Sequence, residues 1–212
     1  MANLDILFNS IVAGKLEPAV EITQEAINEH LDPQMIINNY MIKGMEEIGN
    51  RFQNNKAYVP ELLMSARAMK GALELLKPHL KGERSVTIGK IVIGTVMGDL
   101  HDIGKNLVAS MFEGCGFEVV NLGVNISTAK FIEILKKENP DILCLSALLT
   151  TTMQNMKVVI DALEKEGLRD KVKVMVGGAP VTQAFAESIG ADGYSNNANE
   201  AVIKAKELLA IA

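Results

Sequence analysis

The spacing of the apolar residues changes near residue 85, and this change constrains the fold more than any other feature of the chain. From Leu4 to about Leu80, apolar residues recur every three or four positions, which predicts helices. From Lys90 onward, short runs rich in β-branched residues alternate with amphipathic stretches, which predicts strands that are each followed by a helix. We therefore expect two domains, residues 1–83 and 90–212, joined by a linker at residues 84–89.

The first region predicts a small antiparallel bundle of four helices, because only short segments separate the helical patterns. Asp32-Pro33 and Val59-Pro60 are typical helix starts, since proline loses no bonded N–H in a first turn. Gly14 suits a helix end. The expected helices are Leu4–Ala13, Leu16–His30, Pro33–Asn54 and Pro60–Leu80. The apolar face of the last one is expected to comprise Leu62, Leu63, Ala66, Met69, Leu73 and Leu76.

The second region predicts five strand-then-helix units, which require right-handed crossovers and a parallel sheet covered on both faces. The expected fold class is therefore α + α/β, a four-helix bundle followed by a Rossmann-like, flavodoxin-like sheet. The expected strands are 90–96, 117–124, 141–148, 172–177 and a weak last one near Tyr194. The expected helices are 105–112, 128–137, 153–165, 182–188 and 200–209.

Charge and composition exclude several classes of function. The net charge of -5 leaves no basic field for a phosphate backbone, so we expect no nucleic-acid partner. No apolar run approaches the length of a membrane span and the N-terminus has no leader pattern, so we expect a cytoplasmic protein without a membrane partner. Cys115 and Cys144 stand alone in apolar surroundings, which indicates buried free thiols.

The segment GDLHDIGK follows the first predicted strand, at the edge where ligands bind in open parallel sheets. It places His101 between Asp99 and Asp102, and a carboxylate beside the second ring nitrogen is usual for a metal-ligating histidine. A zinc site would need further His or Cys ligands that this domain lacks, so a metal bound by His101 must bring its other ligands with it. The motif alone also fits a capped loop with a surface histidine.

Two further strand ends face the same edge. The third strand closes in hydroxyl residues, Thr150 to Thr152, which alone would fit a helix N-cap. The fourth closes in Gly177-Gly178, which alone would fit a turn or a slot where a bulky group passes close to the backbone. Together, the three loops offer a ligand histidine, a row of hydroxyls and a slot without side chains.

The runs GTVMGDLHDIGKN, SAL and VGGAP resemble the signature of cobalamin-binding domains of the methionine synthase and corrinoid methyl-carrier type. RFQNNKAYVPELLMSARAMKGAL is similar to the helical cap that shields the upper face of the corrin in that family. The resemblance therefore spans nearly the whole chain and is strongest to the free-standing corrinoid proteins of methanogens and acetogens.

The resemblance implies a role for each matching residue. His101 would be the lower axial ligand of cobalt, Asp99 its hydrogen-bond partner and Thr152 the hydroxyl that completes the relay. The binding loop as a whole would be Gly98, Asp99, Leu100, His101, Asp102, Ile103 and Gly104. The buried nucleotide tail would be lined by Gly104, Ser146, Leu148, Thr150, Gly177, Gly178 and the turn from Asn196 to Ala198. Cap contacts to the corrin would come from Tyr58, where the family usually has Phe, Met64 and Ala68.

The implied function is a carrier that holds a methyl group on the cobalt of cobalamin or a related corrinoid, alternating between cob(I)alamin and methylcobalamin. We see no second acid or base suited to activating a methyl donor, so we expect a non-catalytic component that relies on partner proteins. The implied partners are a substrate-specific methyltransferase, a second methyltransferase acting on tetrahydrofolate or coenzyme M, and a reductive activase. The segment from Pro78 to Thr87 is the expected hinge for cap movement.

Three alternatives remain at this point. The chain could be the cobalamin-binding subunit of an adenosylcobalamin-dependent isomerase, although such subunits generally resemble only its second half. A cobalamin-using sensor would carry a further signalling domain, for which 212 residues leave no room. A flavodoxin-like module without cobalamin would leave His101 without a role. The methyl donor, whether methylamine, methanol, betaine or a methoxylated aromatic, is not encoded in a cobalamin pocket, nor are the acceptor, the corrinoid's lower base and the oligomeric state.

Overall fold

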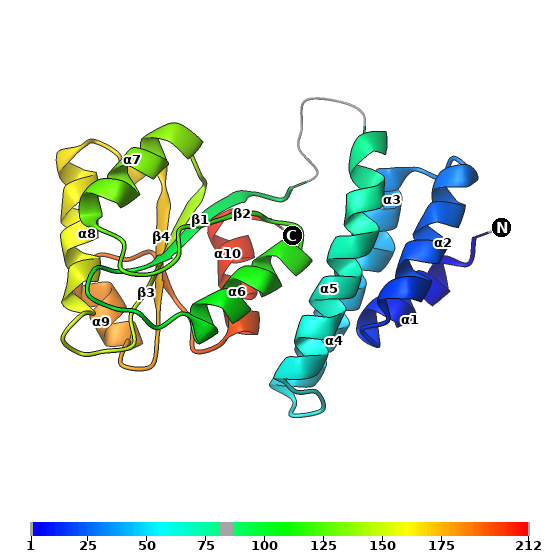
Figure 1. Ribbon diagram of the computed structural model, residues 1–212, viewed down its shortest axis with the longest axis horizontal. Helices are drawn as coiled ribbons and strands as arrows, with labels where there is room; N and C mark the ends of the chain where they lie inside the picture. The colour runs from blue at the N-terminus through cyan, green and yellow to red at the C-terminus, as the bar shows by residue number, and fades with distance from the viewer. Residues whose placement is uncertain (1, 81–86, 212) are drawn as a thin grey trace. The chain divides into compact units, whose positions relative to one another are not determined.

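The fold comes from a computed structural model that describes residues 2–80 and 87–211. The chain divides into two compact units (Figure 1). The first contains the residues up to Ile88 together with Ser110–Phe117, and the second contains Gly89–Ala109 together with the residues from Glu118 onward. The proposed linker residues 84–86, and residues 81–86 of the expected hinge, lie outside the described residues.

The first unit is built from helices that pack as a bundle, as the spacing predicted. Helix α1 packs against α2 and α4, and α5 packs against the same two helices. The elements are α1 (Leu4–Val12), α2 (Leu16–Asn28), α3 (Pro33–Ile36), the π-helical segment η1 (Ile37–Met41), α4 (Ile42–Gln53), α5 (Val59–Leu76) and the 3-10 segment η2 (Lys77–His79).

The helix boundaries follow the predicted local chemistry. Asp32 accepts a hydrogen bond from the backbone N–H of Gln34 at 3.2 Å, and Pro33 opens α3 behind it. Gly14 follows α1 with a φ of +64°, a left-handed conformation that glycine adopts without strain. A side chain there would also meet Cβ of Met64 at 2.5 Å, so packing requires the glycine as well.

The helix predicted over Pro33–Asn54 runs without a break from Pro33 to Gln53, but it contains the π-helical turn η1, which apolar spacing does not reveal. One expectation for the helical region was wrong. Leu63, predicted for the buried face of α5, is exposed, whereas Ser65, Ala68 and Ala72 are buried. Four of the eight buried residues of α5 are therefore small, and hydrophobicity alone does not select them.

The second unit contains a five-stranded parallel sheet in the order β2-β1-β3-β4-β5. The prediction of a parallel sheet with alternating helices is confirmed. Its strands are β1 (Lys90–Thr95), β2 (Glu118–Asn121), β3 (Ile142–Ser146), β4 (Lys173–Gly177) and β5 (Gly193–Tyr194). The helices that follow the strands are α6 (Ile103–Gly114), α7 (Thr128–Glu138), α8 (Gln154–Lys165), α9 (Gln183–Ser188) and α10 (Ala198–Leu208), with a 3-10 turn η3 (Arg169–Lys171). The end of α6, from Ser110, is grouped with the first unit.

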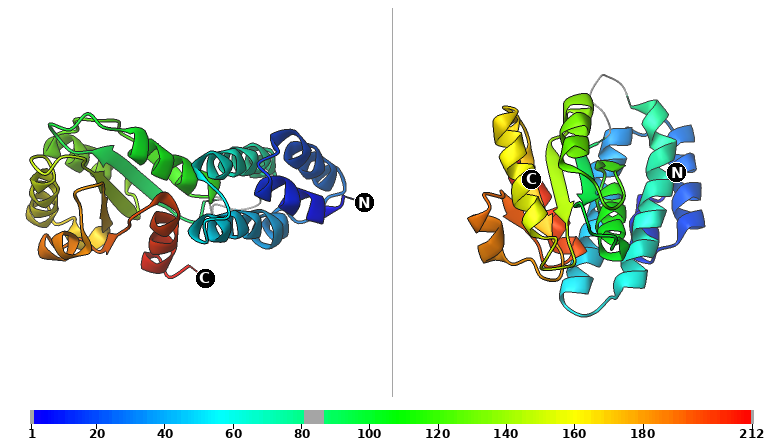
Figure 2. Two further views of the ribbon diagram at one scale, coloured as in Figure 1. Left: turned by 90° about the horizontal axis from the view of Figure 1, so that it is seen from below. Right: turned by 60° about the vertical axis from the view of Figure 1, so that its left-hand side comes forward.

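Helices cover both faces of this sheet. Helices α7, α8 and α9 lie on one face, and α6 and α10 lie on the other (Figures 1 and 2). Alternate strand residues such as Val92, Leu143 and Val174 join the buried cluster that contains Phe131 of α7 and Ile160 of α8. Strands buried on both faces explain the continuous β-branched runs of the sequence.

The strand order creates a topological switch point between β1 and β3. From β1 the chain passes to β2 on one side of it and then returns to place β3 on the other side. In sheets of this kind, ligands bind beyond the carboxyl ends of the strands at such a point. The loops after β1 and β3 are therefore where a site should be sought.

Candidate functional site

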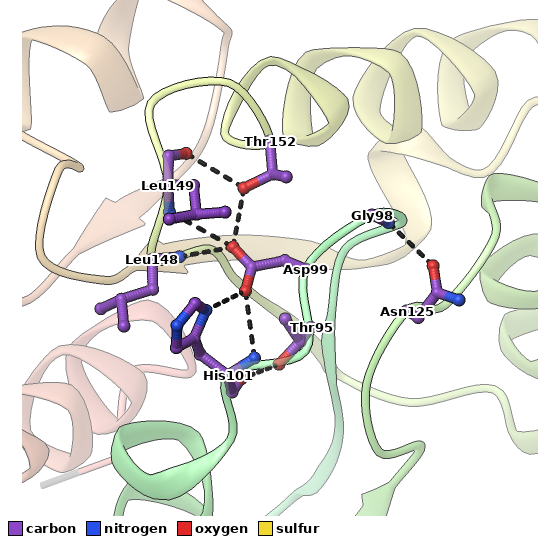
Figure 3. A network of polar contacts seen from close by, with 8 residues as sticks. All are labelled: Thr95, Gly98, Asp99, His101, Asn125, Leu148, Leu149 and Thr152. Carbon is purple, nitrogen blue, oxygen red and sulfur yellow. Dashed lines mark hydrogen bonds and ion pairs between the residues drawn. The ribbon is translucent and has the colours of Figure 1, made fainter.

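Asp99 is the centre of a hydrogen-bond network at the switch point (Figure 3). Its side chain is fully buried just after β1. Oδ2 accepts from the N–H of Leu148 at 2.8 Å, the N–H of Leu149 at 3.3 Å and the hydroxyl of Thr152 at 2.7 Å. These three donors belong to the loop after β3, so the network joins the two loops that flank the switch point.

The other oxygen of Asp99 orients His101. Oδ1 accepts from the His101 backbone N–H at 3.1 Å and lies 2.7 Å from ring Nδ1. Burial opposes ionisation of this carboxyl, but the hydrogen bonds from Thr152, Leu148 and His101 outweigh it and hold the pKa of Asp99 well below its usual range. An ionised carboxylate only accepts, so Nδ1 must carry the proton and Nε2 is left with a lone pair. The His101 side chain is 51% exposed, so that nitrogen is available to a ligand.

Thr152 has a different role from the helix cap that its position also allowed. The residue before α8 is Met153, which provides no side-chain cap. The Thr152 hydroxyl is instead turned to Asp99, and its methyl group lies 3.5 Å from where a Cβ on Gly98 would be. Thr150 and Thr151 are exposed. Of the three threonines, only Thr152 therefore joins the network.

The two loops that hold Asp99 and His101 also expose large apolar side chains. Leu100 and Ile103 are 71% and 87% exposed, although each is a large hydrophobic residue. Met97, Leu148 and Leu149 are also exposed. Gly104 has no atom within 4 Å of where its Cβ would be, so the space beside it is open. An open apolar surface with one directed nitrogen donor fits a large flat ring that carries a metal at its centre.

The far side of the predicted tail slot lies at the ends of β4 and β5. Gly178 has a φ of +132°, and a Cβ there would lie 1.8 Å from the carbonyl oxygen of Ala147. The chain's own packing thus requires this glycine. Gly177 has only a carbonyl oxygen of Ser195 near its Cβ position, at 3.7 Å. The hydroxyl of Tyr194 contacts the side chain of Asn196.

The remaining predicted residues are distributed as follows. Ser146 is half-buried at the end of β3, Asp102 is exposed, and Ala198 is buried at the start of α10. In the first unit, Tyr58 and Met64 are exposed on α5 and the residue before it, whereas Ala68 is fully buried.

Sequence reasoning missed three residues that hold the loop after β1. Thr95, the fully buried last residue of β1, donates its hydroxyl to the His101 carbonyl at 2.9 Å. Asn125 accepts from the Gly98 N–H at 2.8 Å, and Asn155 donates to the Met97 carbonyl at 2.8 Å. Asn125 has a φ of +55°, which asparagine tolerates better than most residues. An asparagine directly after a predicted strand was the signal available in the sequence.

Lys105 was also missed. Its ammonium group is buried beside α6 and donates to the side-chain oxygens of Asn106 and Asn121 at 2.6 and 2.7 Å. Burial lowers the pKa of Lys105, and the charge of Asp102 opposes that shift. The network ties the first turn of α6 to the end of β2. It therefore supports the loop that carries His101 from the side opposite β3.

Within residues 2–80 and 87–211, no group of three or more His, Cys, Asp or Glu side chains could hold a metal ion. A metal at His101 would therefore need ligands from outside these side chains. Among the same residues, no helix is long and apolar enough to cross a membrane.

The chain is similar to known proteins along almost its full length. Residues 89–203 match a family described as "B12 binding domain", and residues 4–77 match a second family with the same description. A "Dimethylamine corrinoid protein" of Methanosarcina barkeri is 47% identical over 98% of this chain and 97% of its own length.

Two solved structures share the fold at 31% identity and 98% coverage of this chain. A cobalamin-binding protein from Desulfitobacterium hafniense DCB-2 has a TM-score of 0.83 with 99% of its chain covered. A chain of the methanol:cobalamin methyltransferase complex from Methanosarcina barkeri has a TM-score of 0.85 with 79% of its length covered.

Proposed function

This chain belongs to the B12-binding family, and we propose that it carries a methyl group on the cobalt of a corrinoid between two methyltransferases. It binds a corrinoid cofactor and works as part of a methyltransferase system. The observation that carries the proposal is the orientation of His101 by buried Asp99 at the switch point of the sheet. There a directed ligand nitrogen and exposed apolar side chains occur in the same two loops.

His101 would bind cobalt through Nε2, because Asp99 holds the proton on Nδ1. Asp99 itself is fixed by Leu148, Leu149 and Thr152. The imidazole therefore keeps its direction whether or not a metal is bound. Fixing the outer ligand shell in this way is what tunes a metal-bound histidine.

A bound corrinoid would supply a cobalt atom that accepts and donates a methyl group. The chain's own part would be to hold the imidazole that binds the metal and to stabilise it when it is free. A free imidazole would take a proton on Nε2 while Asp99 keeps the bond to Nδ1. The ionised carboxylate stabilises the resulting cation, and Thr152 helps to hold the carboxylate in place.

The remaining predicted contacts complete the proposed site. The nucleotide tail would enter beside Gly104 and lie between the ends of β3 and β4, against Ser146, Leu148, Thr150, Gly177 and Gly178, and reach Asn196 and Ala198. This path of the tail is supported by the open space at Gly104 and by the absence of a side chain at Gly177. Tyr58, Met64 and Ala68 would cover the corrin from the helical unit. The exposed side chains of Tyr58 and Met64 support that role, whereas the fully buried Ala68 does not.

We propose a methylated amine as the methyl donor, because the Methanosarcina relative is a dimethylamine corrinoid protein. A substrate-specific methyltransferase would load the carrier, and a second one would pass the methyl group to tetrahydrofolate or coenzyme M. A reductive activase would restore cobalt after accidental oxidation. An adenosylcobalamin-dependent isomerase is not favoured, since the helical half also matches the family and the relatives serve methyl transfer.

The test of the ligand is spectroscopic. We would reconstitute the chain with hydroxocobalamin, reduce it to cobalt(II) and record paramagnetic spectra of the wild type, His101→Ala and His79→Ala. His79 is also an exposed histidine but lies in the helical unit, which makes it the matched control. Nitrogen coupling from the protein should vanish only in His101→Ala. Nitrogen coupling that persists in His101→Ala would show that His101 is not the cobalt ligand.

The test of the function follows the methyl group. Holoprotein reduced to cobalt(I) should acquire label from isotopically labelled dimethylamine when a dimethylamine methyltransferase is present, and lose it to coenzyme M or tetrahydrofolate when the second methyltransferase is added. A holoprotein that keeps its histidine ligand but takes no label from any methylated amine would overturn the donor class. One that cannot be methylated even by methyl iodide would overturn the carrier function.

A further inference from the structure

Thr95 holds the backbone of the residue that carries the ligand nitrogen. Its side chain is fully buried at the end of β1, and its hydroxyl donates to the carbonyl oxygen of His101 at 2.9 Å, six positions along the chain (Figure 3). A buried hydroxyl must find an acceptor, and this one reaches past the loop to the ligand residue itself.

Thr95 is itself a rigid support. Its N–H donates to the Gly123 carbonyl at 3.0 Å, its own carbonyl accepts from Ile126 at 3.0 Å, and it is paired with Ser146 across the sheet. The residue is therefore fixed by β3 and by the loop after β2, and not by the loop that it holds. Motion of the loop can be resisted only by such an outside anchor.

The contacts of His101 divide between two residues. Asp99 receives the His101 backbone N–H and ring Nδ1, and Thr95 donates to the carbonyl. The carbonyl belongs to the peptide that leads into Asp102, whose own carbonyl accepts the N–H of Asn106 in the first turn of α6. The Thr95 bond therefore fixes the peptide between the ligand residue and the helix that follows it.

We propose that Thr95 is a positioning residue for His101, holding its carbonyl so that Nε2 keeps the distance and direction that cobalt requires. This inference rests on the proposed function of His101. Asp99 alone sets the rotation of the imidazole, whereas the height of the residue above the sheet depends on both of its peptide groups. Loss of the Thr95 hydroxyl should weaken axial ligation by about threefold to tenfold, the usual effect of one hydrogen bond.

The test compares Thr95→Ala with Thr95→Ser in the full chain loaded with hydroxocobalamin, because these two variants differ only in the hydroxyl oxygen. Paramagnetic spectra of the cobalt(II) form give the ratio of His-bound to His-free cobalt. If nearly all of the cobalt(II) is His-bound, this ratio cannot be measured. The cobalt(II)/cobalt(I) midpoint potential then reports the change in the strength of His101 ligation. His101 would bind cobalt(II) but not cobalt(I), so a tenfold weakening of His101 binding to cobalt(II) raises the midpoint potential by about 59 mV.

We expect the ratio to fall or the potential to rise in Thr95→Ala and to return to the wild-type value in Thr95→Ser. Thr23→Ala is the control, since Thr23 is equally buried but donates at 2.7 Å to Ala19 within its own helix. If Thr95→Ala fails to retain the cofactor, Thr95→Val replaces it, because valine keeps the shape without the hydroxyl.

The outcomes separate this inference from the proposed function. A wild type without nitrogen coupling from the protein would overturn the assignment of His101. Normal coupling in the wild type, with equal ratios and potentials in Thr95→Ala and Thr95→Ser, would overturn the role of Thr95 alone. A shift of equal size in Thr23→Ala would do the same, because it would show a general effect of stability.

Discussion

The loop between β1 and α6 and the first turns of α5 both expose side chains that the proposed function needs, but they are built in opposite ways. In the loop, Asp99 is buried and receives hydrogen bonds on both carboxylate oxygens, so His101 has one direction. At the start of α5, Tyr58 and Met64 are 69% and 52% exposed. The first region is defined by directed polar contacts and the second by apolar surface.

The difference corresponds to what each region has to do. A metal ligand must point at one atom, which requires fixed partners around it. A cover over a flat ring needs only apolar area that excludes water, and methionine adapts to many shapes. Substitution of the buried Asp99 should therefore have a large effect on stability, and substitution of the exposed Tyr58 and Met64 a small one.

The largest effect is expected for Asp99→Asn. An amide has only one accepting oxygen, so its NH2 group would face either the buried donors of Leu148, Leu149 and Thr152 or the backbone N–H of His101, and one side would be left unpaired. We expect the free energy of unfolding to fall by about 2–3 kcal/mol, measured by chemical denaturation. Asp102→Asn is the matched control, because Asp102 is exposed in the same loop. Equal losses in the two variants would break the contrast between buried and exposed carboxylates.

An intermediate effect is expected when pH is lowered on the metal-free chain. The folded state holds the pKa of Asp99 below the usual carboxyl value of about 3.9, so the unfolded chain binds its proton first. The stabilisation that this carboxylate provides should be complete near neutral pH and should decline as pH falls below about 5. Denaturation curves of the wild type and Asp99→Asn at several pH values should therefore converge in acid. Parallel curves would indicate that folding does not lower the pKa of Asp99.

The smallest effect is expected for Tyr58→Ala and Met64→Ala, which should change the free energy of unfolding by no more than about 0.5 kcal/mol. Met69→Ala on the same helix is the control: Met69 is fully buried, and its truncation should cost about 2–5 kcal/mol. Large losses at Tyr58 or Met64 would give these side chains a structural role and remove the difference between the two regions.

The spacing of apolar residues and the positions of proline and glycine were sufficient to predict most of the fold. Alternating strands and helices predicted the parallel sheet, and Asp32-Pro33 marked a helix start that the structure confirms. The π-helical turn at Ile37–Met41 could not be predicted, since it depends on how one residue is accommodated in packing. The exposure of Leu63 likewise depends on which helices surround α5.

The site was also predicted only in part, because some of its residues form a pattern along the chain and others are brought in by packing. Asp99, His101 and Thr152 form a recognisable pattern along the chain, and the structure brings them together. Thr95, Asn125 and Asn155 have no such pattern, because each acts on the loop from a neighbouring element. Gly178 was predicted for a ligand slot, but its nearest constraint is the carbonyl of Ala147. The contacts of the three loop-holding residues and the packing of Gly178 both depend on which strands are adjacent, which the sequence does not state.

The distance along the chain between Asp99 and its donors has a consequence for biosynthesis. The donors on Leu148, Leu149 and Thr152 follow Asp99 by 49, 50 and 53 positions. During translation, the carboxylate therefore leaves the ribosome long before its partners exist and stays hydrated until β3 pairs with β1. Cofactor loading through His101 would be competent only after that pairing, so a chain that has not completed its central sheet offers the corrinoid no oriented ligand.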